Sequence, residues 1–156
     1  RRQRQMCIRD SPFTLRRDAS IFEVGGYSNY MGALGLTKSI QLLEAEGIDA
    51  IEGRIRSLVR RLLNGLEKLP VHIASPTDDP HLSPTVSFNF GLVGGSAHEK
   101  KLETYLVQRR IYVSLRCNAG TGGIRVSINY YNTESDVDAL LDAVAAFLAG
   151  ESGNKA

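Results

Sequence analysis

The chain has 156 residues, of which 42% are hydrophobic and 23% are charged, a balance typical of a soluble globular domain. Its apolar runs are shorter than the roughly 20 residues that a transmembrane helix needs, and its start does not resemble a signal peptide, so we expect a cytoplasmic protein without membrane contact. Cys7 and Cys117 lie far apart. Their spacing predicts neither a disulfide framework nor a metal site.

The net charge of +2 comes from the first residues of the chain. Residues 1–17 contain six arginines and one aspartate, which leaves a net charge of −3 for the other 139 residues. No nucleic-acid motif accompanies this basic tail, so we do not expect nucleic acid as a partner. We interpret residues 1–17 as a partly artefactual tail, residues 18–149 as one domain, and residues 150–156 as a loose tail.

Two helices are predicted at the start of this domain. Apolar residues recur at helical spacing over 30–46, and Gly47 provides a stop signal. The second helix spans about 49–68, with leucines and isoleucines on one side and arginines mostly on the other. We interpret the arginines as a solvated face rather than as a binding patch.

Strands and a third helix follow. Residues 71–74 and 85–90 alternate like strands around a turn-rich segment. A helix is predicted at about 97–109, with Ser96 as its N-cap and Glu99 in the capping-box position. Two more strands, 111–115 and 124–129, are predicted on either side of the glycine-rich sequence RCNAGTGG.

The last helix has the clearest signals. Thr133 and Asp136 form a capping box, and a continuous apolar stripe runs from Val137 to Leu148. Long helices beside a few short strands predict an α+β fold, in which helices cover one face of a small, mainly antiparallel sheet.

Arg125 lies within a strand-like segment. Strand alternation places Ile124, Val126 and Ile128 on one face, and Arg125, Ser127 and Asn129 on the other. A guanidinium on this polar face suits the capture of a carboxylate or a phosphate. A surface ion pair with one of the chain's acidic residues explains the arginine equally well, so the residues alone leave both interpretations open.

Three segments carry a resemblance to a known family. RVSINYYNTESDVDALL resembles the C-terminal signature of the class V aminotransferases, the pyridoxal-phosphate enzymes related to cysteine desulfurases. FEVGGYSNYMGALGLTKSIQLL and GIDAIEGRIRSLVRRLLNGLEKLP resemble that family's entry into its small domain and the helix pair that follows. The matching order covers residues 22–147, which implies a C-terminal small domain of such an enzyme.

The resemblance also implies roles for particular residues. Arg125 would bind the α-carboxylate of an amino-acid substrate, and Arg116 would lie near the mouth of the active site. Gly25, Gly26 and Ser28 would approach the phosphate of a pyridoxal 5'-phosphate bound to the other subunit of a homodimer. Gly26 stands where the family has a side chain that contacts this phosphate, so Ser28 or backbone amides would have to replace that contact.

Two features depart from the family's complete pattern. Cys117 lies only seven residues before Arg125, too close for the desulfurase nucleophile, so the short loop resembles the branch without desulfurase activity. No lysine stands in the sequence context that holds the cofactor. We therefore expect no catalytic residue in this chain and no activity from it alone. The alternative is a non-enzymatic α+β module that binds a small acid through Arg125 and Arg116.

Overall fold

The computed structural model describes residues 29–91, 97–118 and 121–152. The chain divides into two compact units, residues 1–45 and residues 46–156. The helices are α1 (Tyr30–Glu46), α2 (Ile48–Leu66), α3 (Ala97–Gln108) and α4 (Glu134–Ser152), and a 3-10 turn spans Asp79–His81. The strands are β1 (His72–Ile73), β2 (Thr85–Asn89), β3 (Ser114–Asn118) and β4 (Thr121–Ser127).

Helix α1 begins at a side-chain cap and contains no buried residue. The Asn29 side-chain oxygen accepts a hydrogen bond from the Gly32 N–H at 2.8 Å, the usual contact of an N-cap. Six large apolar side chains of α1 are nevertheless exposed: Tyr30, Met31, Leu34, Leu36, Ile40 and Leu42. A helix with this composition normally lies against other protein surfaces.

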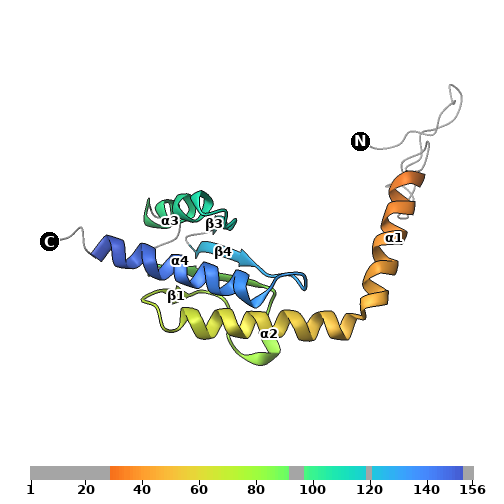
Figure 1. Ribbon diagram of the computed structural model, residues 1–156, viewed down its shortest axis with the longest axis horizontal. Helices are drawn as coiled ribbons and strands as arrows, with labels where there is room; N and C mark the ends of the chain where they lie inside the picture. The colour runs from red at the N-terminus through yellow and green to blue at the C-terminus, as the bar shows by residue number, and fades with distance from the viewer. Residues whose placement is uncertain (1–28, 92–96, 119–120, 153–156) are drawn as a thin grey trace, which may run out of the picture. The chain divides into compact units, whose positions relative to one another are not determined.

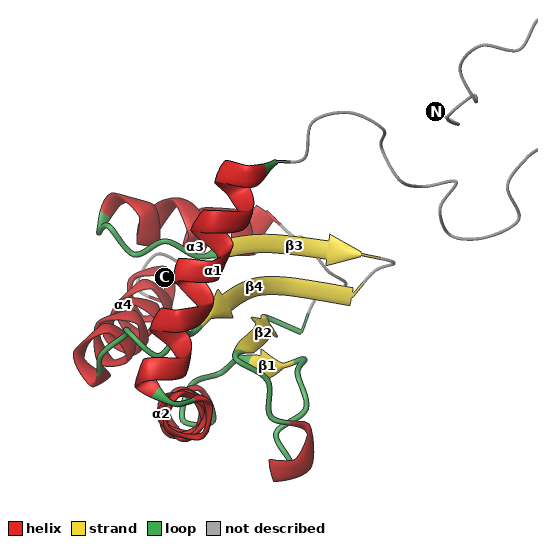
Figure 2. Ribbon diagram, turned by 90° about the vertical axis from the view of Figure 1, so that its right-hand side faces the viewer, coloured by secondary structure: helices red, strands yellow, loops and turns green. Residues whose placement is uncertain are grey.

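The second unit contains a four-stranded antiparallel sheet, which confirms the predicted fold class. The strand order is β1-β2-β4-β3, and every neighbouring pair is antiparallel. Helices α2, α3 and α4 lie on one side of this sheet (Figures 1 and 2). The opposite face carries the polar side chains of the strands.

The core lies between the sheet and the three helices. The sheet contributes Val86, Phe88, Ile124 and Val126, all of which are buried. The helices contribute buried residues at the positions that the apolar periodicity predicts, which include Leu58, Leu62 and Leu66 of α2, Leu102 and Leu106 of α3, and Val137, Leu140, Val144 and Phe147 of α4. The apolar stripes predicted for these helices are therefore confirmed.

The hairpin of β3 and β4 corrects the predicted strand bounds. Residues 111–115 were expected to form a strand, but β3 begins at Ser114. The Ile111 N–H instead bonds the Leu106 carbonyl at 3.0 Å and closes the C-terminal turn of α3. Part of the expected glycine-rich connection belongs to the strands, because Arg116 pairs with Gly123 and Cys117 with Gly122. Ser96, the predicted cap of α3, lies outside the described residues.

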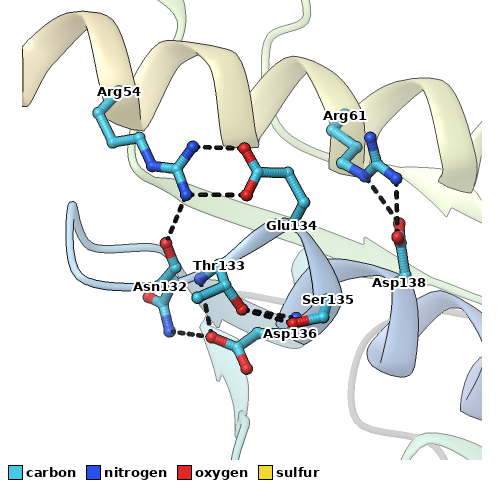
Figure 3. A network of polar contacts seen from close by, with 8 residues as sticks. All are labelled: Arg54, Arg61, Asn132, Thr133, Glu134, Ser135, Asp136 and Asp138. Carbon is cyan, nitrogen blue, oxygen red and sulfur yellow. Dashed lines mark hydrogen bonds and ion pairs between the residues drawn. The ribbon is translucent and has the colours of Figure 1, made fainter.

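Bidentate ion pairs join α2 to the start of α4 (Figure 3). The Arg54 guanidinium contacts both carboxylate oxygens of Glu134, and Arg61 donates two hydrogen bonds of 2.7 Å to Asp138. The arginine face of α2 was predicted to be solvated, and Arg61 is indeed exposed, but Arg54 and Arg61 also form interhelical ion pairs that the sequence did not predict. Among the described residues, no helix is both long and apolar enough to span a membrane.

Candidate functional site

Arg125 lies at the centre of the polar face of the sheet. On β4 it pairs with Ser87 of β2 on one side and with Ser114 of β3 on the other. Residues directly opposite each other on antiparallel strands project from the same face, so the two serines flank the arginine. This arrangement surrounds a cation with two hydroxyl groups, each of which can donate a hydrogen bond to an anion.

The Arg125 side chain is half-buried and incompletely hydrogen bonded. Its Nε atom is buried and has no hydrogen-bond partner. Among the residues that the structure describes, no carboxylate forms an ion pair with it. A buried donor without a partner costs about 1–3 kcal/mol. Arg125 is therefore ready to bind an anion, and the surface ion pair that the sequence left open does not form within the described part of the chain.

Arg116 lies beside Arg125 on the same face. It pairs with Gly123 across the β3–β4 hairpin, so Arg125 is its diagonal neighbour, at about 7–8 Å between such positions. Gly123 has no side chain that could separate the two cations. Arg116 is exposed and has no ion pair within the described residues. Two neighbouring guanidinium groups without a counter-ion repel each other, and a bound anion relieves that repulsion.

The arginines of α2, unlike Arg125 and Arg116, are paired with acidic side chains. Arg54, Arg56, Arg60 and Arg61 each form an ion pair with an acidic side chain. The hydrogen bond from Arg54 lowers the pKa of Glu134 to about 2, and that from Arg61 lowers the pKa of Asp138. The charges of α2 are thus neutralised within the fold, whereas those of Arg125 and Arg116 are not.

Gly25, Gly26 and Ser28 lie outside the described residues. Cys117 lies on β3 opposite Gly122, and its side chain is also outside the description. The four described lysines, Lys38, Lys68, Lys100 and Lys101, are all exposed. The described residues contain no group of His, Cys, Asp or Glu side chains that could hold a metal ion.

Sequence reasoning missed the two serines that flank Arg125. The signal was present in the sequence TVSFN, where a strand alternation places Ser87 on the polar face. It could not be used without the register, because only the pairing of β2 with β4 brings Ser87 opposite Arg125. Ser114 was missed for the same reason.

The family model described as "Aminotransferase class-V" matches residues 8–140 of the chain. A protein of Pyrococcus abyssi named "Probable cysteine desulfurase" is 30% identical over 128 residues, which are 74% of this chain and 30% of that protein. The chain therefore spans about a third of the length of such relatives.

Solved structures show the same relationship. A cysteine desulfurase from Thermococcus onnurineus superposes with a TM-score of 0.72 and 27% identity, over 88% of this chain and 36% of that one. The cystine C-S lyase C-DES, solved with its product cysteine persulfide, gives a TM-score of 0.65 and 26% identity over 92% and 36% of the two chains. Another structure of C-DES holds glycine covalently linked to a PLP cofactor.

Proposed function

Because the chain belongs to the aminotransferase class V family, we propose that residues 18–149 are the C-terminal small domain of a pyridoxal-phosphate enzyme and that Arg125 binds the carboxylate of its amino-acid substrate. The unpartnered, buried Nε of Arg125 is the observation that carries this proposal. The relatives that act on cysteine or cystine make a sulfur-containing amino acid the first substrate to test.

The polar face of the sheet supplies the chemistry for this role. A planar guanidinium binds a carboxylate through two parallel hydrogen bonds, which fixes the position and the orientation of the amino acid. Ser87 and Ser114 can donate further hydrogen bonds from either side, since they are the cross-strand neighbours of Arg125. Arg116 adds positive charge at the exposed edge of the site. A substrate held in one orientation reacts faster, because less entropy is lost on the way to the transition state.

The cofactor itself does not fit the described residues. Pyridoxal 5'-phosphate withdraws electrons from a bound amino acid and is held in its enzymes by a lysine. The four described lysines are exposed on α1, on α3 and just after the end of α2, and a buried, desolvated amine is absent from the described residues. We therefore propose that this chain binds the carboxylate of the substrate. The lysine that holds the cofactor would belong to the part of the longer relatives that this chain does not cover. On this proposal the chain alone is inactive.

Helix α1 supports a role in subunit contacts. Its side chains Leu36 and Ile40 are 62% and 46% exposed, and Met31 and Leu34 are also exposed. Burying each such side chain is worth about 1.5–3 kcal/mol. We assign α1 to the interface of a homodimer. Sedimentation of the purified chain should give a dimer, and Leu36→Ser with Ile40→Ser should shift it to a monomer; a wild-type chain that sediments as a monomer would contradict this assignment.

The carboxylate role can be tested on the chain as it is. Titration with L-cysteine under reducing conditions should move the Nε–H signal of Arg125 in ¹⁵N-labelled protein, with millimolar affinity, because a half-buried bidentate pair contributes only a few kcal/mol. The amino alcohol L-cysteinol lacks the carboxylate and serves as the matched ligand. It should leave the signal unchanged.

Variants of the same position complete this test. Arg125→Gln should abolish the response to L-cysteine, and Arg125→Lys should weaken it about tenfold, since lysine cannot form the bidentate contact. Arg60→Gln removes a cation on α2 and should bind like the wild type. Equal responses to L-cysteine and L-cysteinol, or unchanged binding by Arg125→Gln, would refute the carboxylate role.

The missing lysine requires a separate experiment. The chain is incubated with pyridoxal 5'-phosphate, reduced with borohydride and analysed by peptide mass spectrometry. Only trace labelling scattered over exposed lysines is expected. Stoichiometric labelling of one lysine would show that the chain carries a cofactor site of its own.

A further inference from the structure

A cleft of about 480 Å³ opens where the end of α3, the end of β4 and the start of α4 meet. Its lining is apolar at the base, with Leu62, Ile111, Val126, Ile128, Val137 and Leu140. Neither Arg125 nor Arg116 lines it. A volume of this size, with an apolar base and a few polar groups, is typical of sites that bind small organic molecules.

The polar groups of the cleft leave it positively charged. Arg109, Arg110 and Asp136 are its charged lining residues. The Asp136 carboxylate is already engaged in the cap of α4, since it accepts the Thr133 N–H at 2.8 Å. Arg109 lies over the Tyr105 ring, with its guanidinium carbon 3.4 Å from the ring centroid. The guanidinium of Arg110 has no hydrogen bond or ion pair to any described residue, so it is the cation available to a ligand.

The backbone of Arg110 is unusual for an arginine. Its φ angle is 61°, and within the described segments it is the only residue other than glycine with a positive φ. It occupies the position after α3 where glycine normally ends a helix, because the Arg110 N–H bonds the Val107 carbonyl and the Ile111 N–H bonds the Leu106 carbonyl. Glycine would adopt this conformation without strain. Strained residues of this kind are concentrated at functional sites.

From these observations we infer that the cleft binds a small organic carboxylate with a hydrocarbon body, with Arg110 holding the carboxylate. The apolar base selects the hydrocarbon, and the uncompensated positive charge at the rim selects the anion. Arg109 adds to the positive potential while it stays against Tyr105. This site is independent of the Arg125 site, because the two share no lining residue.

Straight-chain carboxylates are the probes that test this site. Titration of the ¹⁵N-labelled chain with butyrate, hexanoate and octanoate should move the backbone amides of Ile111, Val113 and Ile128. Affinity should rise with chain length by up to about fourfold for each added methylene, the amount expected for burying a CH₂ group. Octylamine, which carries the opposite charge, and inorganic phosphate, which has no hydrocarbon, should not move these signals.

Two substitutions of one residue separate binding from folding. Arg110→Gly should raise the Tm because it removes the backbone strain, and it should weaken octanoate binding about threefold to tenfold. Arg110→Lys should retain most of the affinity. Lys68→Gln removes an exposed cation outside the cleft and should bind octanoate like the wild type.

Three results would overturn the inference. The first is a response of the cleft amides to octylamine equal to that to octanoate. The second is unchanged octanoate affinity in Arg110→Gly while its Tm shows that it is folded. The third is a response confined to α1, whose exposed apolar side chains offer hydrocarbon chains a site without a matching cation.

Discussion

Gly65 of α2 lies directly against Leu141 of α4. A Cβ atom built on Gly65 would stand 2.7 Å from Cδ2 of Leu141, and its Cδ1 would be closer still. The two helices therefore approach each other through the absence of a side chain at Gly65. Gly53, also within α2, has no heavy atom within 4 Å of such a Cβ, so the same helix contains both a packed and an open glycine.

This contrast gives opposite predictions for one substitution. Gly65→Ala should lower the free energy of unfolding by about 1–3 kcal/mol, because the methyl group overpacks the α2–α4 contact. Gly53→Ala should raise it by about 0.5–1 kcal/mol through helix propensity alone. Urea unfolding followed by circular dichroism measures both. The double variant Gly65→Ala, Leu141→Ala should lose less unfolding free energy than the two single variants lose together. Strictly additive losses would show that the contact with Leu141 does not cause the effect of Gly65→Ala.

The ion pair of Arg54 and Glu134 predicts a pH dependence. The hydrogen bond from Arg54 lowers the pKa of Glu134 from 4.5 to about 2 in the folded chain. Between these values the unfolded chain binds the proton that the folded chain excludes, so stability falls as the pH falls. The contribution of the pair should be complete above about pH 5 and lost near pH 2. Asp138, whose pKa is lowered by Arg61, acts in the same direction.

The measurement compares the wild type with Glu134→Gln, which cannot ionise. Their difference in unfolding free energy should be constant above pH 5 and should shrink steadily towards pH 2. Because the pair is exposed, added salt should reduce the difference as well. A difference that stays the same from pH 6 to pH 2 would show that the pair does not couple protonation to folding.

Thr133 and Asp136 were recognised in the sequence because a capping box is a local pattern. Their reciprocal contacts are present: the Asp136 N–H donates to Thr133 Oγ1 at 3.2 Å, and the Thr133 N–H donates to Asp136 Oδ2 at 2.8 Å. The stripe of α4 was equally local. The polar face of Arg125 also followed from alternation along one strand, and the structure places it as expected.

The features that were not predicted depend on contacts between distant residues or on backbone conformation. Ile111 looked like the start of a strand because isoleucine favours strands, but its N–H closes the turn after α3. Ser87 became part of the site only through pairing with β4. The left-handed conformation of Arg110 could not be predicted from residue type, because that position usually belongs to glycine.

The capping box gives a third prediction. Thr133→Ala should lower the free energy of unfolding by about 1 kcal/mol, since it leaves an N–H at the start of α4 without its side-chain acceptor. Thr133→Ser keeps the hydroxyl group and should retain most of the stability. Ser57→Ala removes an exposed hydroxyl group within α2, away from the cap, and should change the free energy of unfolding by no more than about 0.5 kcal/mol. A loss of stability in Ser57→Ala as large as that in Thr133→Ala would argue against the cap.

Gly123 gives the last prediction, and it bears on the site. Its φ is 141°, and a Cβ there would stand 2.8 Å from Cβ of Asn89 and 3.0 Å from the carbonyl carbon of Phe88. The carbonyl group of Phe88 belongs to the backbone and cannot move aside as a side chain can. Gly123→Ala should therefore lower the free energy of unfolding by about 2–5 kcal/mol. Gly91 has a φ of 75°, and no atom lies within 4 Å of a Cβ built there. Gly91→Ala should therefore lower the free energy of unfolding by only about 1–2 kcal/mol.

The comparison of these two glycines separates close approach from backbone conformation. If Gly123→Ala still folds, the shift of β4 against β2 should also weaken L-cysteine binding at Arg125, whereas Gly91→Ala should not. Equal losses of stability for the two variants would mean that the positive φ alone requires glycine at position 123. The larger loss at Gly123 would instead show that β4 needs the space itself, because a Cβ there would meet Phe88 and Asn89.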